Sequence, residues 1–224
     1  NGWVGDPIPY YDNGKFYIFY LQDWRSGYPF LHPWHMVYST DLSSFTFGGE
    51  TIPCGKEDEQ DVALGTGGVI KDRTTGEYCA FYTRHQWKWQ EMGVPTQAIL
   101  LTTSKDMKTW TKKGEHNFYL SLRGQSGYVE NDCRDPHVFY DEEDGLYKMV
   151  VTTHTDAGEK LALFTSKELQ NAKAWTLQEP LYTDPNIWVM ECADVFKEGE
   201  YWYLTYSDVA DRKVHYRYAK SLKG

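Results

Sequence analysis

The sequence lacks both an excess of positive charge and long apolar runs. Its 23 Lys and Arg residues are outnumbered by 32 Asp and Glu residues, which gives a formal net charge of −9. A nucleic-acid partner normally requires a basic face, so we expect no nucleic-acid binding. No apolar run is long enough to cross a membrane, so we expect no membrane partner either.

Cysteine is scarce and shows no pairing pattern. Cys54, Cys79, Cys133 and Cys192 lie far apart without a C-x-x-C pair, and the seven His residues are scattered. This is not a zinc pattern, so we expect neither a metal site nor a cofactor. Buried free thiols in a reducing compartment are the simplest interpretation. We therefore expect a cytoplasmic location, with secretion as the alternative.

Aromatic residues, in contrast, are abundant. Tyr, Phe and Trp make up 17% of the 224 residues. Aromatic side chains favour β-strands and also stack on sugar rings. The length is sufficient for one large domain with a real core, and no long amphipathic helix is evident.

The chain contains an internal repeat with two recurring motifs. The first is a glycine followed by a β-rich run, and it recurs at Gly14, Gly76, Gly145 and Gly199. The second begins at Ser39, Ser104 and Ser166, with a weaker copy at Ala219. Both motifs return after roughly 60 residues, which is typical of a propeller blade built from several short strands.

We therefore predict an all-β fold of the β-propeller type, with about four blades in this chain. The expected blades span approximately residues 1–47, 48–111, 112–176 and 177–224 of a single domain. The glycine-aromatic strand is predicted to be the second strand of each blade. The stretch before it is then the innermost strand, which lines the central channel.

Three of these inner stretches carry an acid at what the sequence suggests is the same position. They are Asp6, Asp135 and Glu191, and the second repeat has Gly65-Thr66-Gly67-Gly68 in that place. We expect the three carboxylates to converge on one pocket. Retaining glycosidases use a nucleophile and a general acid about 5–5.5 Å apart, and a neighbouring negative charge helps to keep the acid protonated. The pattern therefore suggests glycoside chemistry.

These motifs resemble the three signature motifs of glycoside hydrolase family 32, which includes invertases, inulinases and levanases. Asp6-Pro7 after Trp3, Arg134-Asp135-Pro136 and Glu191-Cys192 occur in the family's order. Weaker matches cover most of the chain, including Phe19-Tyr20-Leu21-Gln22, Trp34-His35 and Tyr82-Thr83. The resemblance implies a five-bladed propeller, usually followed by a β-sandwich.

The resemblance also implies roles for individual residues. Asp6 is expected to be the nucleophile, Glu191 the general acid and base, and Asp135 the residue that binds fructose hydroxyls. The expected substrate-binding residues are Trp3, Gln22, Trp34, Thr66, Arg134 and Cys192.

The sequence also departs from the family pattern. Gly5 and Ile8-Pro9 stand where the first motif usually carries Asn residues, and Leu64-Gly65-Thr66-Gly67 replaces a Phe-Ser-Gly core. Only four repeats are found, so we expect the fifth blade and the C-terminal β-sandwich to be absent from this chain. These differences bear on the identity of the substrate more than on the class of reaction.

The sequence therefore predicts a retaining β-fructofuranosidase that hydrolyses sucrose or short β-fructans such as fructo-oligosaccharides. A fructosyltransferase with the same three acids remains open, as does a non-catalytic carbohydrate-binding propeller. An inverting glycosidase acting on arabinose- or xylose-containing glycans is a further alternative, which the Arg-Asp-Pro and Glu-Cys motifs disfavour. The oligomeric state is left open.

Overall fold

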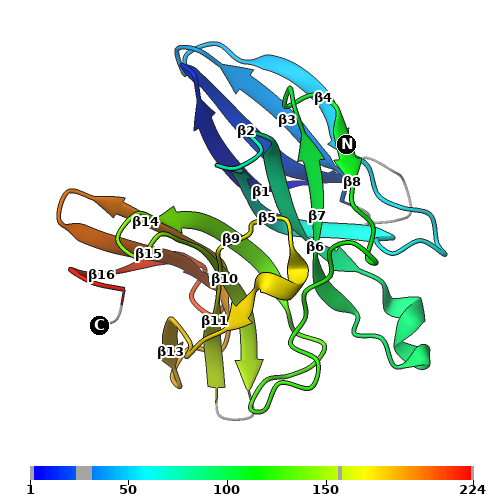
Figure 1. The fold of residues 1–224 in the computed structure, drawn as a ribbon, viewed down its shortest axis with the longest axis vertical. Coiled ribbons are helices and arrows are strands. Elements are labelled where there is room, and N and C mark those ends of the chain that lie inside the picture. Colours follow the sequence, from blue (N-terminus) through cyan, green and yellow to red (C-terminus); the bar gives the residue numbers. More distant parts are fainter. Residues whose placement is uncertain (1–2, 24–31, 156–157, 223–224) are drawn as a thin grey trace.

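The chain folds into four antiparallel β-sheets arranged like the blades of a propeller (Figure 1). A computed structural model describes residues 3–23, 32–155 and 158–222. The predicted all-β, propeller-type architecture is confirmed, and four blades are present in the part of the chain that the structure describes. Among these residues no helix is long and apolar enough to span a membrane.

Each blade begins at the channel and runs outward strand by strand. Blade 1 contains β1 (Trp3–Asp12), β2 (Lys15–Asp23), β3 (Trp34–Ser39) and β4 (Thr46–Ile52). Blade 2 contains β5 (Ala63–Lys71), β6 (Tyr78–His85), β7 (Gln97–Ser104) and β8 (Trp110–Lys112). A 3-10 helix, η1 (Trp87–Met92), lies between β6 and β7.

The other two blades follow the same plan. Blade 3 contains β9 (Arg134–Asp141), β10 (Leu146–Thr155), β11 (Gly158–Ser166) and β12 (Thr176–Leu177). The short β13 (Tyr182–Asp184) also pairs with β11, and η2 (Ala172–Ala174) precedes β12. Blade 4 contains β14 (Met190–Glu198), β15 (Tyr201–Asp208) and β16 (Lys213–Ala219). The blade ends expected near residues 47, 111 and 176 fall inside β4, β8 and β12, the last strands of the first three sheets.

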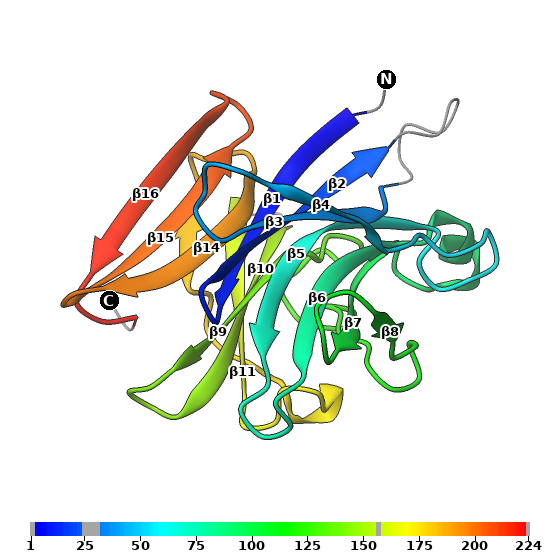
Figure 2. The same ribbon diagram turned by 90° about the horizontal axis from the view of Figure 1, so that it is seen from above.

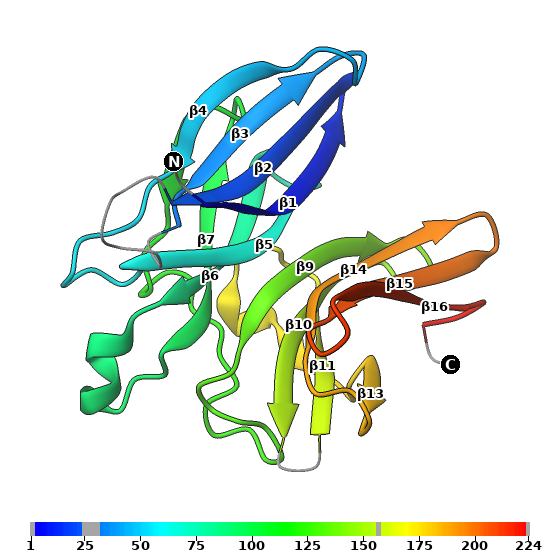
Figure 3. The ribbon, with the colours of Figure 1, turned by 180° about the vertical axis from the view of Figure 1, so that it is seen from behind.

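The four inner strands form a row at the centre of the molecule. β1 contacts β5, β5 contacts β9, and β9 contacts β14. Figures 2 and 3 show the blades fanning out from this row, with β1 and β14 at its two ends. Residues far apart in the sequence therefore meet along the inner strands.

The glycine motif marks the turn between the first and second strands of each blade. Gly14, Gly76, Gly145 and Gly199 all have positive φ, between 60° and 76°. Glycine adopts this left-handed conformation without the steric cost of a Cβ atom. In blade 1, Asn13 also has positive φ, as a two-residue type I′ hairpin turn requires.

The serine motif forms the turn that leads to the outer strand. In blade 1, Ser39 Oγ accepts hydrogen bonds from the backbone N–H groups of Asp41 and Leu42, and Asp41 Oδ1 accepts from those of Ser43 and Ser44. Ser104 and Asp106 make the same bonds in blade 2. Side chains thus satisfy the backbone donors of the turn, which explains why the motif repeats.

The hydrophobic core lies between neighbouring blades. One cluster, with Phe19 and Trp34, fills the space between blades 1 and 2, and two others join blades 2 and 3 and blades 3 and 4. Phe81 and Tyr82, adjacent on β6, belong to different clusters. Because successive side chains on a strand point to opposite faces, blades 2 and 3 each pack against a neighbour on both sides.

Every inner strand carries a β-bulge at the same level. Two residues stand opposite one on the second strand at Asp6-Pro7, Gly65-Thr66, Asp135-Pro136 and Cys192-Ala193. Asp6 and Asp135 are therefore structurally equivalent, as predicted. The position of Glu191 corrects the sequence alignment, because Glu191 lies one residue before the bulge and Cys192 is the equivalent of the two aspartates.

Gly67 is the position where this packing is tightest. A Cβ atom added there would lie 1.9 Å from the backbone oxygen of Phe81, which cannot move aside as a side chain can. We expect Gly67→Ala to lower the free energy of unfolding by about 2–3 kcal/mol in urea titrations. Gly5→Ala, where no atom lies within 4 Å of the added Cβ, is the control. Equal stability of the two variants would contradict this account.

Candidate active site

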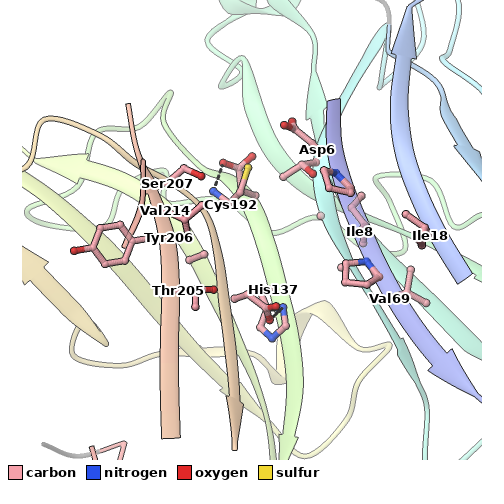
Figure 4. A pocket seen from close by; sticks show the side chains of 18 residues that line it. Asp6, Ile8, Ile18, Val69, His137, Cys192, Thr205, Tyr206, Ser207 and Val214 are labelled. Carbon is pink, nitrogen blue, oxygen red and sulfur yellow. Dashed lines mark hydrogen bonds and ion pairs between the residues drawn. The ribbon is translucent and has the colours of Figure 1, made fainter. Parts of the chain in front are cut away.

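The four inner strands line an open cavity of about 500 Å³. Asp6 from β1, Thr66 from β5, Asp135 from β9 and Cys192 from β14 all line it. Figure 4 shows Asp6 and Cys192 on strands at opposite sides of the cavity. The cavity continues along the faces of β15 and β16, where Tyr206 and Val214 line it.

Asp135 is the most buried of the three acids, with 8% of its surface exposed. Its backbone N–H donates to Thr83 Oγ1 at 2.8 Å, and its Oδ2 accepts from the Cys192 N–H at 3.2 Å. Burial raises the pKa of Asp135 to about 7, although Arg134 and the Cys192 N–H act in the opposite direction. The carboxyl group is therefore protonated in a substantial fraction of molecules near neutral pH.

Arg134 joins the acids electrostatically. Its Nε and Nη2 donate to Glu191 Oε1 at 3.3 and 3.2 Å, and its Nε lies 3.8 Å from Asp135 Oδ2. Arg134 and Glu191 occupy equivalent positions on β9 and β14, each directly before the bulge. Arg134, which the sequence analysis expects to bind substrate, thus contacts two of the acids, and its positive charge balances part of their negative charge.

Asp6 and Glu191 are the accessible acids. Asp6 is exposed, and 40% of the Glu191 side chain is exposed. Desolvation raises the pKa of Asp6, and the negative charge of Glu191 raises it further, against a smaller opposing effect of His32. Glu191 is not among the residues that line the cavity, but the next residue, Cys192, is. The two acids therefore interact electrostatically although they come from opposite ends of the row of inner strands.

The cysteines follow the sequence prediction in part. None of the four forms a disulfide in the described part of the chain; Cys79 and Cys133 are buried, whereas Cys54 and Cys192 are half-buried. Desolvation and the neighbouring carboxylates raise the pKa of Cys192. Its thiol thus stays protonated and presents a small, uncharged surface to the cavity.

The other predicted binding residues differ in position. Thr66 lines the cavity, and Gln22 is half-buried on β2, whose backbone pairs with β1. Trp34 is fully buried in the core, and its Nε1 donates to the Gly65 oxygen at 2.9 Å. It has no exposed surface for the predicted sugar contact, and instead it holds the bulge of β5 from behind. The backbone of Trp3 lies in β1, but its side chain is outside the described part of the chain.

Several residues at the site had no role assigned from the sequence. Thr83 Oγ1 bridges the Thr66 oxygen and the Asp135 N–H. Asp132 contacts Arg134 and His154, and His137 pairs with Asp194 at 3.0 Å. Single polar residues in a β-rich chain give no signal of this kind, because only the register between strands brings them together.

Among the described residues, one group of two carboxylates and a histidine is arranged closely enough to surround a metal ion. It consists of Asp208, Asp211 and His215, and all three are at the β15–β16 hairpin. These side chains are not part of the arrangement around Arg134.

Comparison with known proteins identifies the family. Residues 1–219 match the N-terminal domain of the glycosyl hydrolases family 32. The chain belongs to glycosyl hydrolase family 32. The resemblance recognised in the three acid motifs is thereby confirmed, and the blades are those of the family's catalytic propeller domain.

Relatives with curated functions include a levanbiose-producing levanase of Bacillus subtilis. It is 26% identical over 200 residues, which cover 87% of this chain and 35% of the levanase. A fructan 1-exohydrolase from Cichorium intybus, solved with 1-kestose, has a TM-score of 0.78 at 17% identity. The match covers 96% of this chain and 42% of the exohydrolase chain. A Bombyx mori β-fructofuranosidase, solved with sucrose, has a TM-score of 0.69 at 20% identity. The match covers 92% of this chain and 41% of the β-fructofuranosidase chain. The chain thus spans less than half the length of these proteins.

The raised pKa of Asp135 predicts a dependence of stability on pH. Its pKa lies above the ordinary value of 3.8, so the folded chain holds this proton more tightly than the unfolded chain does. The resulting stability is fully present below about pH 4 and is lost as the pH rises through about 7. Asp135→Asn cannot ionise. We therefore expect its stability relative to the wild type to rise by about 2–4 kcal/mol between about pH 4 and about pH 8.

Urea unfolding of both proteins across this pH range measures the difference. Parallel stability curves for the wild type and Asp135→Asn would show that the folded state does not perturb this carboxyl group.

Proposed function

We propose that the protein is a retaining β-fructofuranosidase that hydrolyses β-linked fructans, fructo-oligosaccharides or sucrose. Membership of family 32 and the levanase and fructan hydrolase names of the relatives support this substrate class. Since the chain spans less than half of those relatives, the activity is proposed for the complete gene product.

The observation that carries the proposal is the placement of two accessible acids around a buried third. Asp6 on β1 and Glu191 on β14 come from opposite ends of the row of inner strands, and the charge of one raises the pKa of the other. Two carboxylates on either side of a glycosidic bond are what double displacement requires. The buried Asp135 lies between them in the row, on β9.

In the first step, an Asp6 oxygen attacks the anomeric carbon of the fructosyl unit. The bond to the leaving sugar breaks as Glu191 donates its proton to the glycosidic oxygen, and a fructosyl ester of Asp6 remains. In the second step, ionised Glu191 takes a proton from water, and the resulting hydroxide displaces Asp6. Fructose is released with its anomeric configuration retained, and Glu191 is protonated again.

The remaining residues bind and position the sugar in this proposal. Asp135 accepts hydrogen bonds from fructose hydroxyls, and its burial strengthens these bonds in the oxocarbenium-like transition state. Thr66 offers a hydroxyl group, and Cys192 closes the cavity wall with its protonated thiol. Trp3 and Gln22 are proposed to shape the fructose pocket from β1 and β2.

Asp6→Asn tests the role of the nucleophile. The amide cannot form the ester, so we expect fructose release from sucrose and from levan and inulin oligomers to fall by about 10⁴-fold or more while the fold is kept. Glu191→Gln should reduce the rate on the same substrates by about 10²–10⁴-fold, the usual contribution of a general acid.

Glu198→Gln is the matched control, since Glu198 is an exposed acid on the same strand as Glu191 and is not among the residues that line the cavity. It should keep most of the activity. An active Asp6→Asn variant would remove the proposed nucleophile, and the ranking of the substrates would identify the preferred linkage.

A further inference from the structure

A fourth carboxylate, which the proposed mechanism does not use, contacts the Arg134 side chain beside the Arg134–Glu191 pair. Asp132 is 8% exposed and uses both of its oxygens. Oδ1 accepts from Arg134 Nη1, and Oδ2 contacts His154 Nδ1. The four side chains thus form a continuous chain of charged contacts in the order Glu191, Arg134, Asp132 and His154.

The sheet register brings this chain of contacts together. Arg134, the first residue of β9, pairs with Thr152 on β10. Continuing the antiparallel register by two residues places Asp132 opposite His154. Two backbone hydrogen bonds hold the segment before β9 against β10. The Val129 N–H donates to the His154 oxygen, and the Asp132 N–H donates to the Val129 oxygen. Asp132 is therefore held by the backbone as well as by its partners.

The nitrogens of the Arg134 guanidinium bind two different carboxylates. Its Nη1 end binds Asp132, while Nε and Nη2 both donate to Oε1 of Glu191. Oε2 of Glu191 has no hydrogen-bond partner among the described residues, so it is available to face a glycosidic oxygen. The guanidinium can hold the Glu191 carboxylate in one orientation only if the guanidinium is itself held in place.

Without Asp132, Asp135 is an alternative partner for the guanidinium among the described residues. Its Oδ2 already lies 3.8 Å from Arg134 Nε, and the Arg134 side chain is only 15% exposed, so water does not readily replace a lost ion partner. The expected consequence is rotation of Arg134 toward Asp135, with loss of the two bonds that orient Glu191.

We propose that Asp132, supported by His154, is the positioning residue that aligns the general acid Glu191 through Arg134. This inference rests on the proposed function. It predicts a selective defect in protonation of the leaving group, because Asp132 is not among the residues that line the cavity beside the nucleophile Asp6.

The test compares two substrates in the complete gene product. Hydrolysis of a fructan oligomer requires protonation of the leaving oxygen, whereas β-fructosyl fluoride loses fluoride without it. We expect Asp132→Ala to lower kcat/KM on the oligomer by about 10–100-fold, which is less than the full contribution of a general acid, and to change kcat/KM on the fluoride by less than about threefold. Asp132→Asn keeps an acceptor for Arg134 and should lose less.

Two further variants make the result specific. His154→Ala should reproduce the selective defect in weaker form, and it tests the proposal if Asp132→Ala does not fold. Asp141→Asn is the matched control, because Asp141 is also a buried carboxylate; it pairs with Lys148 at the end of β9 opposite to Arg134. It should lower the unfolding temperature but leave the ratio of the two kcat/KM values unchanged.

An equal loss on both substrates, or no loss on the oligomer, would overturn the positioning role while leaving the proposed function intact. Failure of the wild type to hydrolyse either substrate would remove the proposed function and this role together.

Discussion

The site depends on a single backbone constraint, the β-bulge that all four inner strands carry at one level. In three blades the first residue of the bulge has a left-handed conformation without being glycine, with φ of 51° at Asp6, 54° at Asp135 and 52° at Cys192. Such residues cost of order 1–3 kcal/mol each and persist only where the surrounding structure enforces them. Here the pairing on both sides of each bulge and the packing between blades do so, and the strained residues are the ones that face the cavity.

Arg134 is the electrostatic counterpart of this constraint. The bulges bring Asp6, Asp135 and Glu191 near one another, and without a cation their mutual repulsion would favour protonation or separation. One guanidinium contacts Glu191 and Asp135 on one side and Asp132 on the other. The charges remain close, yet they differ in access. Asp135 is buried with a raised pKa, whereas Asp6 and Glu191 stay open to a ligand.

The sequence predicts the blades well because each repeat carries its own local signals. Glycines at the inner hairpins and Ser-x-Asp turns before the outer strands act within a few residues, so their spacing gives the strand order directly. The one-residue offset of Glu191 could not be predicted, because a bulge changes which residues stand opposite each other without changing the local sequence. The predicted sugar contact of Trp34 is wrong for a related reason. An aromatic residue in a strand gives the same sequence pattern whether its side chain faces the core or a ligand. The contact between Asp132 and His154 depends on the register between two segments, so the local sequence of neither segment predicts it.

The central claim is that Asp6 and Glu191 divide one double displacement between them, with Asp6 carrying the sugar. Trapping the covalent intermediate tests this most directly. Glu191→Gln, given β-fructosyl fluoride, should form the ester but lack the base that activates water for its hydrolysis. Peptide mass spectrometry should then find one fructosyl unit on Asp6. A fructosyl unit on another residue, or continued turnover without any adduct, would contradict the account.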